Sequence, residues 1–313
     1  MRNLPPAISV REVGPRDGLQ NEATIPTDAK VALLDALSTT GVRRIEAVSF
    51  VSPAAIPQMA DAAEVWARIT RHPNVRYSAL VPNLRGARRA LEAGFGEIEV
   101  VVSASDTHNR VNLNRSTQQS LDDIAGLLAV IHGAGATCQV IVSTAWGCPY
   151  EGDVPIERVL GVASRAVRDG ADGISFGDTT GMATPGRVMS LVGKFRSAHP
   201  QVPLNLHFHN TRGTGLANVF AALQLGVTDF DASVGGLGGC PYAPGASGNI
   251  ATEELVYLAE DLGVDTGIDL GALIAVAAEA EQAVGHRLPS QVLRAGPRTR
   301  RSPLPESLAP DRE

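Results

Sequence analysis

The chain has 313 residues, of which 44% are hydrophobic and 19% are charged. These proportions are those of an ordinary globular protein and suffice for a large core in one or two domains. The formal net charge of −6 argues against wholesale nucleic-acid binding, and the sequence has no apolar span long enough to cross a membrane. We therefore expect neither a nucleic acid nor a membrane as a partner.

The first residues, Met1–Pro6, have neither the apolar core of a signal peptide nor the Arg- and Ser-rich pattern of a transit peptide. We therefore expect a cytoplasmic protein. Its three cysteines, Cys138, Cys148 and Cys240, are too few and odd in number for a disulfide framework, so reduced thiols are expected. Cys148 and Cys240 lie in similar Gly-Cys-Pro-Tyr segments, but the sequence assigns no chemistry to Cys148.

Short segments rich in β-branched residues alternate with segments whose apolar residues have helical spacing. The predicted strands are Ile8–Val13, Arg44–Phe50, Val75–Val81, Glu97–Ser103, Thr137–Ser143, Gly173–Phe176, Pro203–His209 and Asp229–Val234. The predicted helices include Asp28–Thr40, Ala60–Arg71, Ser116–His132, Ile156–Arg168, Pro185–His199, Gly215–Leu225 and Thr252–Leu262. Eight such units favour an α/β fold of the closed (β/α)8 TIM-barrel type over an open, doubly wound sheet. No glycine-rich phosphate turn of the open-sheet type follows the first strand.

An additional C-terminal helical segment follows the eighth unit. The Ala-rich stretch Leu270–Val284 is expected to pack against the barrel or against a second subunit, which weakly suggests a homo-oligomer. We therefore expect one TIM-barrel catalytic domain over residues 1–286, including this helix. Residues 287–313, with their Pro, Arg, Ser and Glu, are expected to form a largely disordered tail.

Active sites of such barrels lie where the strands end and the following loops begin. Polar clusters occupy these places in the sequence. They are GPRDGLQNE at 14–22, SFVSP at 49–53, GDTTG at 177–181, HFHN at 207–210 and the glycine-rich segment 235–249. We expect these clusters to share one end of the barrel.

Two histidines at the end of the seventh strand suggest a metal site. His207 and His209 are two residues apart, so on a strand their imidazoles point the same way. Asp17 and Asn249, also at strand ends, can add oxygen ligands, and this mixed set suits Mg²⁺ or Mn²⁺. The alternatives are two buried, hydrogen-bonded histidines, an Asp17 that caps a turn and an Asn249 that caps the last barrel helix.

Three further charged residues lie near these strand ends. Arg16 can present its guanidinium to a carbonyl, carboxylate or enolate oxygen, or form a surface ion pair. Glu46 lies within the second strand, where a carboxylate needs a partner, and we expect it to contact and orient Arg16. Asp178 can be a base, an acceptor for a metal-bound histidine or a cap.

The glycine-rich segment after the eighth strand carries a single thiol, Cys240. Its glycines permit close backbone approach, which is typical of a mobile lid that brings an acid to a site. The alternative is a flexible loop with an incidental cysteine.

At this point the sequence resembles the 3-hydroxy-3-methylglutaryl-CoA (HMG-CoA) lyase family of TIM-barrel metallolyases, over roughly residues 8–285. The resemblance lies in the motifs VGPRDGLQNE (13–22), IE (45–46), SFVSP (49–53), PQMAD (57–61), GDT (177–179), HFH (207–209) and GGCPYAPGASGN (238–249). It implies metal-dependent cleavage of a 3-hydroxyacyl-CoA to acetyl-CoA and a keto acid, as in leucine degradation and ketone-body metabolism. It also implies a homodimer or higher homo-oligomer.

The resemblance assigns roles to individual residues. Asp17, His207, His209 and Asn249 match the family's ligands for a divalent cation, Mg²⁺ or Mn²⁺. Arg16 matches the arginine that stabilises the enolate of acetyl-CoA, and Cys240 matches the catalytic thiol, which we expect to donate the final proton. Gln20 and Glu46 match residues that support the substrate and Arg16, while His207 and Asp178 remain alternative bases.

The chain departs from the family at the margin of the site. The family commonly has Asp after His-x-His, whereas this chain has Asn210 and then Arg212. We expect Arg212 to meet a substrate or CoA anion, or to pair with an acidic surface residue. The resemblance thus implies HMG-CoA as the substrate, cleaved to acetyl-CoA and acetoacetate, and the alternative is a lyase for citramalyl-CoA or a branched-chain homologue.

Two more distant alternatives remain. One is a Claisen-condensing synthase, which shares the Arg-Asp-Gly turn and a His-x-His-Asn strand end, although Cys240 and its loop resemble the lyases. The other is a barrel that binds a metal or CoA without turnover, which would have little reason to keep the ligands, Arg16 and Cys240 together.

Overall fold

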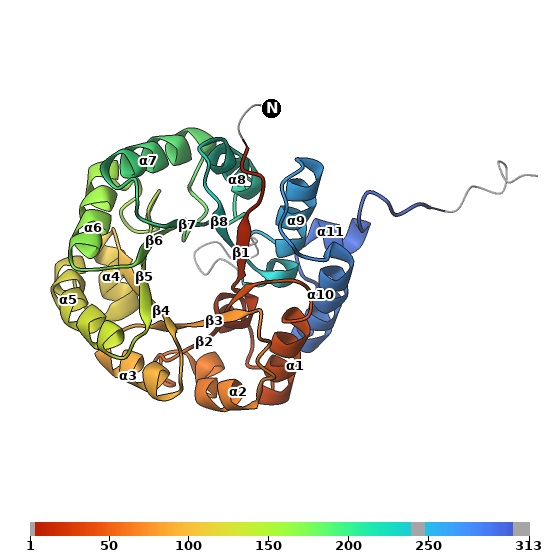
Figure 1. Cartoon of the computed structure of the whole chain (residues 1–313), viewed down its shortest axis with the longest axis horizontal. Coiled ribbons are helices and arrows are strands. Elements are labelled where there is room, and N and C mark those ends of the chain that lie inside the picture. The colour runs from red at the N-terminus through yellow and green to blue at the C-terminus, as the bar shows by residue number, and fades with distance from the viewer. Residues whose placement is uncertain (1–3, 239–247, 303–313) are drawn as a thin grey trace, which may run out of the picture.

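Eight parallel strands close into a barrel in which the last strand pairs with the first (Figure 1). The computed structural model describes residues 4–238 and 248–302 of the chain. The strands are β1 (Ser9–Glu12), β2 (Arg44–Ser49), β3 (Arg76–Val81), β4 (Glu97–Ser103), β5 (Thr137–Ser143), β6 (Gly173–Gly177), β7 (Leu204–His207) and β8 (Asp229–Ala232). The predicted (β/α)8 TIM barrel is confirmed, and each predicted strand overlaps an observed one.

Helices surround the barrel on its outside (Figure 1). They are α1 (Thr27–Leu37), α2 (Ala62–Arg68), α3 (Leu84–Glu92), α4 (Asp106–Leu113), α5 (Thr117–Gly133), α6 (Ile156–Arg168), α7 (Pro185–Ala198), α8 (Gly215–Gln224), α9 (Thr252–Asp261), α10 (Leu270–Val284) and α11 (Gln291–Ala295). Side-chain caps begin several of them; Ser116, for example, forms a capping box with Gln119 at the start of α5.

Strand alternation separates an apolar outer layer from a polar interior. On β8, Phe230 is fully buried, while its neighbour Asp231 forms hydrogen bonds with residues of β1 and β7. Phe208, which follows β7, is also buried, and it alternates with His207 and His209. The polar faces of the strands therefore converge inside the barrel, where the site is built.

The C-terminal helix α10 packs on the barrel rather than presenting a free apolar face. It contacts α1, α9 and the short turn Val234–Gly236 after β8, and its residues Leu273 and Ala277 are fully buried. Of the two alternatives from the sequence, the structure therefore shows the barrel contact.

The predicted disordered tail does not begin at residue 287. Residues 287–302 are described, and they include α11, which the sequence analysis did not expect. Ser290 caps this helix, Leu288 and Val292 bury their side chains, and Arg294 forms an ion pair with Glu281 of α10. Those apolar contacts and the cap order a segment whose composition resembles a disordered one. Residues 303–313 lie outside the described part.

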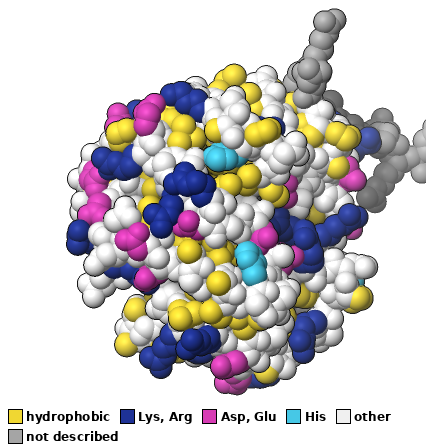
Figure 2. Space-filling model, turned by 60° about the vertical axis from the view of Figure 1, so that its left-hand side comes forward, with side chains coloured by type: hydrophobic (Ala, Val, Ile, Leu, Met, Phe, Trp, Pro, Cys, Tyr) yellow, Lys and Arg dark blue, Asp and Glu magenta, His cyan; other side chains and the backbone are white. Residues whose placement is uncertain are grey.

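The outer surface mixes both signs of charge. On the face in Figure 2, basic and acidic side chains are interspersed with hydrophobic ones. Within the described residues, no helix is both long and apolar enough to span a membrane.

Candidate functional site

A tight turn after β1 presents Arg16 and Asp17 at the barrel mouth. The turn spans Gly14–Gly18 and has π-helical character, because the amide of Gly18 bonds the carbonyl of Val13, five residues earlier, at 3.2 Å; the amide of Asp17 bonds the same carbonyl at 2.7 Å. Gly18 lies so close to the loop after β8 that a Cβ there would come within 2.7 Å of the Cβ of Leu237. The glycine thus lets these two loops meet.

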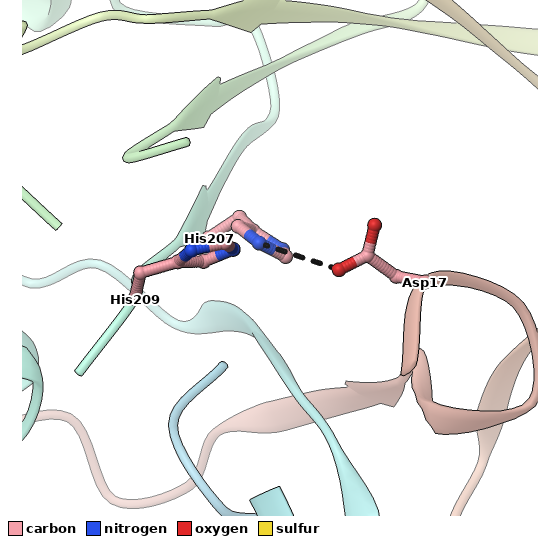
Figure 3. A group of neighbouring side chains, drawn as sticks. All are labelled: Asp17, His207 and His209. Atoms are coloured by element: carbon pink, nitrogen blue, oxygen red, sulfur yellow. Dashed lines mark ion pairs between the residues drawn. The ribbon is translucent and has the colours of Figure 1, made fainter. Parts of the chain in front are cut away.

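Asp17, His207 and His209 form a compact cluster (Figure 3). One potential ligand atom from each of the three residues lies within 4.8 Å of the other two. The imidazole centroids of His207 and His209 are 5.1 Å apart, and Nε2 of His207 lies 4.0 Å from Oδ2 of Asp17. The predicted proximity of these residues is therefore present in the structure.

Asn249 completes the cluster from the segment before α9. A β-bridge aligns it with His209, and its Nδ2 donates to Oδ2 of Asp17 at 2.9 Å and to the carbonyl of Leu237 at 3.0 Å. It does not cap α9, because Ala251 is the N-cap of that helix. The prediction that Asn249 lies beside Asp17 and the histidines agrees with this geometry.

Two buried polar atoms of this cluster have no hydrogen-bond partner among the described residues. They are Nδ1 of His209 and Oδ1 of Asn249. Buried polar groups are normally hydrogen-bonded, so unpartnered atoms need a reason such as a ligand or ion. Imidazole nitrogen, amide oxygen and the carboxylate of Asp17 are suitable donors for a divalent cation, and the residues present therefore fit one.

Charge inside the site sets the protonation of the proposed ligands. Burial raises the pKa of Asp17, but the charges of Arg16 and His207 outweigh this effect and lower the pKa to about 2. Burial and the neighbouring His207 lower the pKa of His209 to about 3. At neutral pH, Asp17 is thus ionised and His209 is neutral, which are the forms that bind cations.

Arg16 lies between two carboxylates. It donates from Nη1 to Oδ1 of Asp17 at 2.7 Å and from Nη2 to Oε2 of Glu46 at 2.6 Å. The predicted contact between Glu46 and Arg16 is confirmed, and the surface ion pair is excluded because Arg16 is only 6% exposed. Gln20 is also adjacent, donating from Nε2 to Oδ1 of Asp17 at 3.2 Å. The arginine is therefore fixed in orientation at the mouth.

Asp178 follows β6 and orders the next turn with one of its oxygens. Its Oδ1 accepts from the amides of Met182 and Ala183 at 2.8 and 3.0 Å, whereas Oδ2 is buried and has no hydrogen-bond partner among the described residues. Burial raises the pKa of Asp178 to about 6. The residue is thus a cap that retains one unpartnered acceptor oxygen.

The acceptor for His207 is Asp231, not Asp178. Oδ2 of Asp231 lies 3.2 Å from Nδ1 of His207. Asp231 and its partners Arg11 and Glu99, all at most 3% exposed, were not among the predicted site residues. A signal was present for two of them, since Glu99 and Asp231 are charged residues between apolar neighbours in predicted strands, where burial demands a partner.

Two predictions need separate comment. Arg212 forms no ion pair with an acidic side chain of the described residues; it donates from Nη1 to the carbonyls of Thr180 and Gly181, at 2.6 and 3.2 Å. The expected pairing with an acidic surface residue is therefore wrong within the described residues, whereas contact with a substrate or CoA anion stays a prediction. Cys240 lies outside the described residues.

Comparison with known proteins places the chain in a family. The HMGL-like family model matches residues 7–279. The chain is 46% identical over 290 residues to a hydroxymethylglutaryl-CoA lyase of Bacillus subtilis, covering 92% of this chain and 97% of the relative. It is 45% identical over 302 residues to an (R)-citramalyl-CoA lyase of Chloroflexus aurantiacus, covering 93% and 95%.

A solved structure has the same fold throughout. It is an HMG-CoA lyase of Acinetobacter baumannii in complex with coenzyme A and 3-methylmalate, with a TM-score of 0.91 and 46% identity. The match covers 96% of this chain and 98% of that one. The chain belongs to the HMGL-like family, and it is an enzyme of the oxo-acid lyase type.

Proposed function

We propose that this enzyme is a divalent-cation-dependent carbon–carbon lyase that cleaves HMG-CoA to acetyl-CoA and acetoacetate. The observation that carries the proposal is the buried cluster of Asp17, His207, His209 and Asn249, with its two unpartnered donor atoms beside a fixed arginine, Arg16. The HMG-CoA lyases among its relatives support this substrate.

The charge of the barrel interior favours a cation. In their ionised forms, Asp17, Glu46, Glu99, Asp178 and Asp231 carry −5, and Arg11 and Arg16 carry +2, so acidic charge is in excess. A divalent cation reduces this excess, and the mixed oxygen and nitrogen donors suit Mg²⁺ or Mn²⁺. Such a cation, when bound, acts as a Lewis acid that polarises substrate oxygens and lowers the pKa of the substrate hydroxyl.

Asp178 is the better supported base. A histidine nitrogen that binds a cation has no lone pair left for a proton, and the other nitrogen of His207 faces Asp231. Asp178 keeps an unpartnered oxygen, and with a pKa of about 6 it is largely ionised at neutral pH. We infer that Asp178 takes the hydroxyl proton as the carbon–carbon bond breaks.

Arg16 and Cys240 act on the enolate that forms when the carbon–carbon bond has broken. The guanidinium of Arg16, held by Glu46, is a fixed set of donors for the enolate oxygen of acetyl-CoA. Gln20, which also contacts Asp17, is proposed to bind the substrate. Cys240, on the loop that follows β8, then protonates the enolate carbon.

A basic cavity beside the mouth can accept the anionic part of an acyl-CoA. The cavity of about 670 Å³ borders Gly238 and Gly248 on one side and the segment His286–Arg294 on the other. Arg287 lines it and has no ion-pair partner among the described residues. Phosphate groups are suitable ligands for such a guanidinium.

A second substrate deserves a direct test because a relative at 45% identity is an (R)-citramalyl-CoA lyase. We propose an assay of HMG-CoA, citramalyl-CoA and branched 3-hydroxyacyl-CoA thioesters, with and without EDTA. HMG-CoA should be cleaved fastest, and EDTA should abolish cleavage until Mg²⁺ or Mn²⁺ is restored.

Cys240→Ser in the same assay tests the proton donor, with Cys148→Ser as a matched control from the other Gly-Cys-Pro-Tyr segment. We expect loss of activity only in Cys240→Ser. Activity that survives both EDTA and this substitution would overturn the mechanism. Homo-oligomeric assembly and a cytoplasmic location stay predictions; sedimentation equilibrium tests the first and cell fractionation tests the second.

A further inference from the structure

A buried network of charges lies directly beneath the cation cluster. Arg11 of β1, Glu99 of β4 and Asp231 of β8 meet inside the barrel, and each is at most 3% exposed. Arg11 forms two parallel bonds to Asp231, from Nε and Nη2, both at 2.8 Å. Its Nη1 contacts Glu99 and also donates to Gln139 of β5 at 2.9 Å. We call these three charged residues the barrel floor.

Asp231 connects the barrel floor to the proposed ligands. Its Oδ1 also accepts from Nδ2 of Asn205 at 2.9 Å, and its Oδ2 lies 3.2 Å from Nδ1 of His207. The two bonds from the guanidinium of Arg11 are the geometry of a guanidinium–carboxylate ion pair, so Asp231 is present as a carboxylate. An ionised carboxylate only accepts hydrogen bonds, so Nδ1 of His207 carries the hydrogen in this contact.

This arrangement fixes which nitrogen of His207 is available. With the hydrogen on Nδ1, Nε2 keeps its lone pair, and Nε2 is the nitrogen that lies 4.0 Å from Oδ2 of Asp17. Partners of this kind orient ligating histidines and contribute to metal affinity. The orientation of His207 thus depends on that of Asp231.

The orientation of Asp231 in turn depends on Arg11. A guanidinium holds a carboxylate in one plane through two parallel bonds, which no single donor can do. Arg11 is itself held by Glu99 and Gln139, from the opposite side of the barrel. We propose that Arg11 is a positioning residue that acts through Asp231 to fix the tautomer and orientation of His207, and so strengthens divalent-cation binding. The second half of this proposal rests on the proposed cation site.

The test is the charge-balanced double variant Arg11→Met with Glu99→Leu. Replacing a buried ion pair by apolar residues of similar size is often tolerated, so this variant is designed to fold. In metal-free protein labelled with ¹⁵N-histidine, the imidazole nitrogen spectrum reports the tautomer at pH 8.5. We expect wild-type His207 to carry its hydrogen on Nδ1 and the double variant to show a mixture of tautomers.

Cation affinity provides a second readout that does not involve turnover. Titration of the metal-free protein with Mn²⁺, followed by electron paramagnetic resonance of the free ion, should give a Kd about 10-fold higher in the double variant. Arg11→Lys keeps the charge but lacks the two-pronged geometry, and it should also bind Mn²⁺ more weakly than wild type. This single variant tests the inference if the double variant does not fold.

The matched control is Arg44→Met with Asp229→Leu. This ion pair, with an N–O distance of 3.1 Å, joins β2 to β8 two residues before Asp231. Its removal should leave both the tautomer of His207 and the Mn²⁺ affinity unchanged. A wild-type tautomer and wild-type Kd in the Arg11 variants would overturn the inference. Failure of the wild-type protein to bind Mn²⁺ would instead overturn the proposed cation site, while the metal-free spectrum would still test the role of Arg11 in positioning His207.

Discussion

The barrel mouth and the barrel floor are both buried and charged, yet they differ in how their polar groups are satisfied. In the floor, both oxygens of Asp231 and three nitrogens of Arg11 have partners within the chain, and of its side-chain nitrogens and oxygens Oε2 of Glu99 alone has none among the described residues. In the mouth, Nδ1 of His209 and Oδ1 of Asn249 have none among the described residues. A buried group without a partner destabilises the fold unless a ligand binds it. The difference indicates that the floor serves the fold and orients the mouth, whereas the mouth is made for a ligand.

The largest effect is expected from His209→Ala in the mouth. Loss of a proposed cation ligand should lower kcat/KM by about 10³-fold, which corresponds to about 4 kcal/mol of transition-state stabilisation. Stability should change little, since Nδ1 of His209 has no hydrogen-bond partner to lose. Steady-state kinetics with saturating Mn²⁺, together with urea unfolding, checks both parts. A large loss of stability would show that this histidine serves the fold instead.

A substitution in the floor should mainly lower the stability of the fold, in contrast to His209→Ala in the mouth. Arg11→Met leaves Asp231 and Glu99 buried without their counter-charge, and this is expected to cost about 3 kcal/mol of unfolding free energy. The double variant with Glu99→Leu should recover the part of that loss that comes from Glu99, whereas Asp231 still lacks its counter-charge. Urea unfolding of both variants measures the free energy of unfolding. If Arg11→Met were as stable as wild type, the floor would not be needed for the fold and the comparison with the mouth would fail.

Arg16→Gln is expected to lower kcat about 100-fold with little change in KM, because a fixed donor to a developing oxyanion acts mainly in the transition state. In Arg16→Gln the carboxylate of Glu46 also loses its hydrogen-bond partner. Glu46→Gln is therefore measured alongside, because it removes the charge of Glu46 and keeps Arg16. Both are measured by initial rates on HMG-CoA. An increase in KM alone would assign Arg16 to ground-state binding.

The smallest of the four effects is a pH dependence. Asp178 must be ionised to accept a proton, so kcat/KM should fall about tenfold per pH unit as the pH drops below about 6. In Asp178→Asn, which keeps an oxygen for the amides of Met182 and Ala183, the residual activity should lack this acidic limb. An unchanged limb in Asp178→Asn would assign the proton transfer to another group.

The sequence was enough to predict the barrel and the ligand cluster. Strand alternation identifies His207 and His209 as neighbours on one face, and the common strand-end position brings Asp17 and Asn249 beside them. The contact between Glu46 and Arg16 followed from the need of a buried carboxylate for a partner. These inferences needed only the alternation of side chains along a strand, the need of a buried charge for a partner, and the fact that all strands of the barrel finish at the same end.

The floor could not be predicted in this way. Arg11 and Glu99 come from strands that are not adjacent in the sheet, and whether two such side chains meet depends on the tilt and stagger of the whole barrel. The backbone contacts of Arg212 were not predicted for a related reason, since they are made with carbonyls of a loop whose conformation the sequence does not specify. The helix α11 was missed because it is only five residues long.

The closure of the barrel by β1 and β8 has a consequence for how the enzyme matures. The hydrogen bond between Asn249 and Asp17 joins residues 232 positions apart, and β8 must pair with β1 before it can form. During synthesis the first proposed ligand, Asp17, thus emerges long before the others, and the proposed cation site is complete only once the final strands are in place. A cation that binds only the closed barrel stabilises that state by mass action. Cation binding would then follow the last step of folding, and a chain that ends before Asn249 would lack one of the proposed ligands.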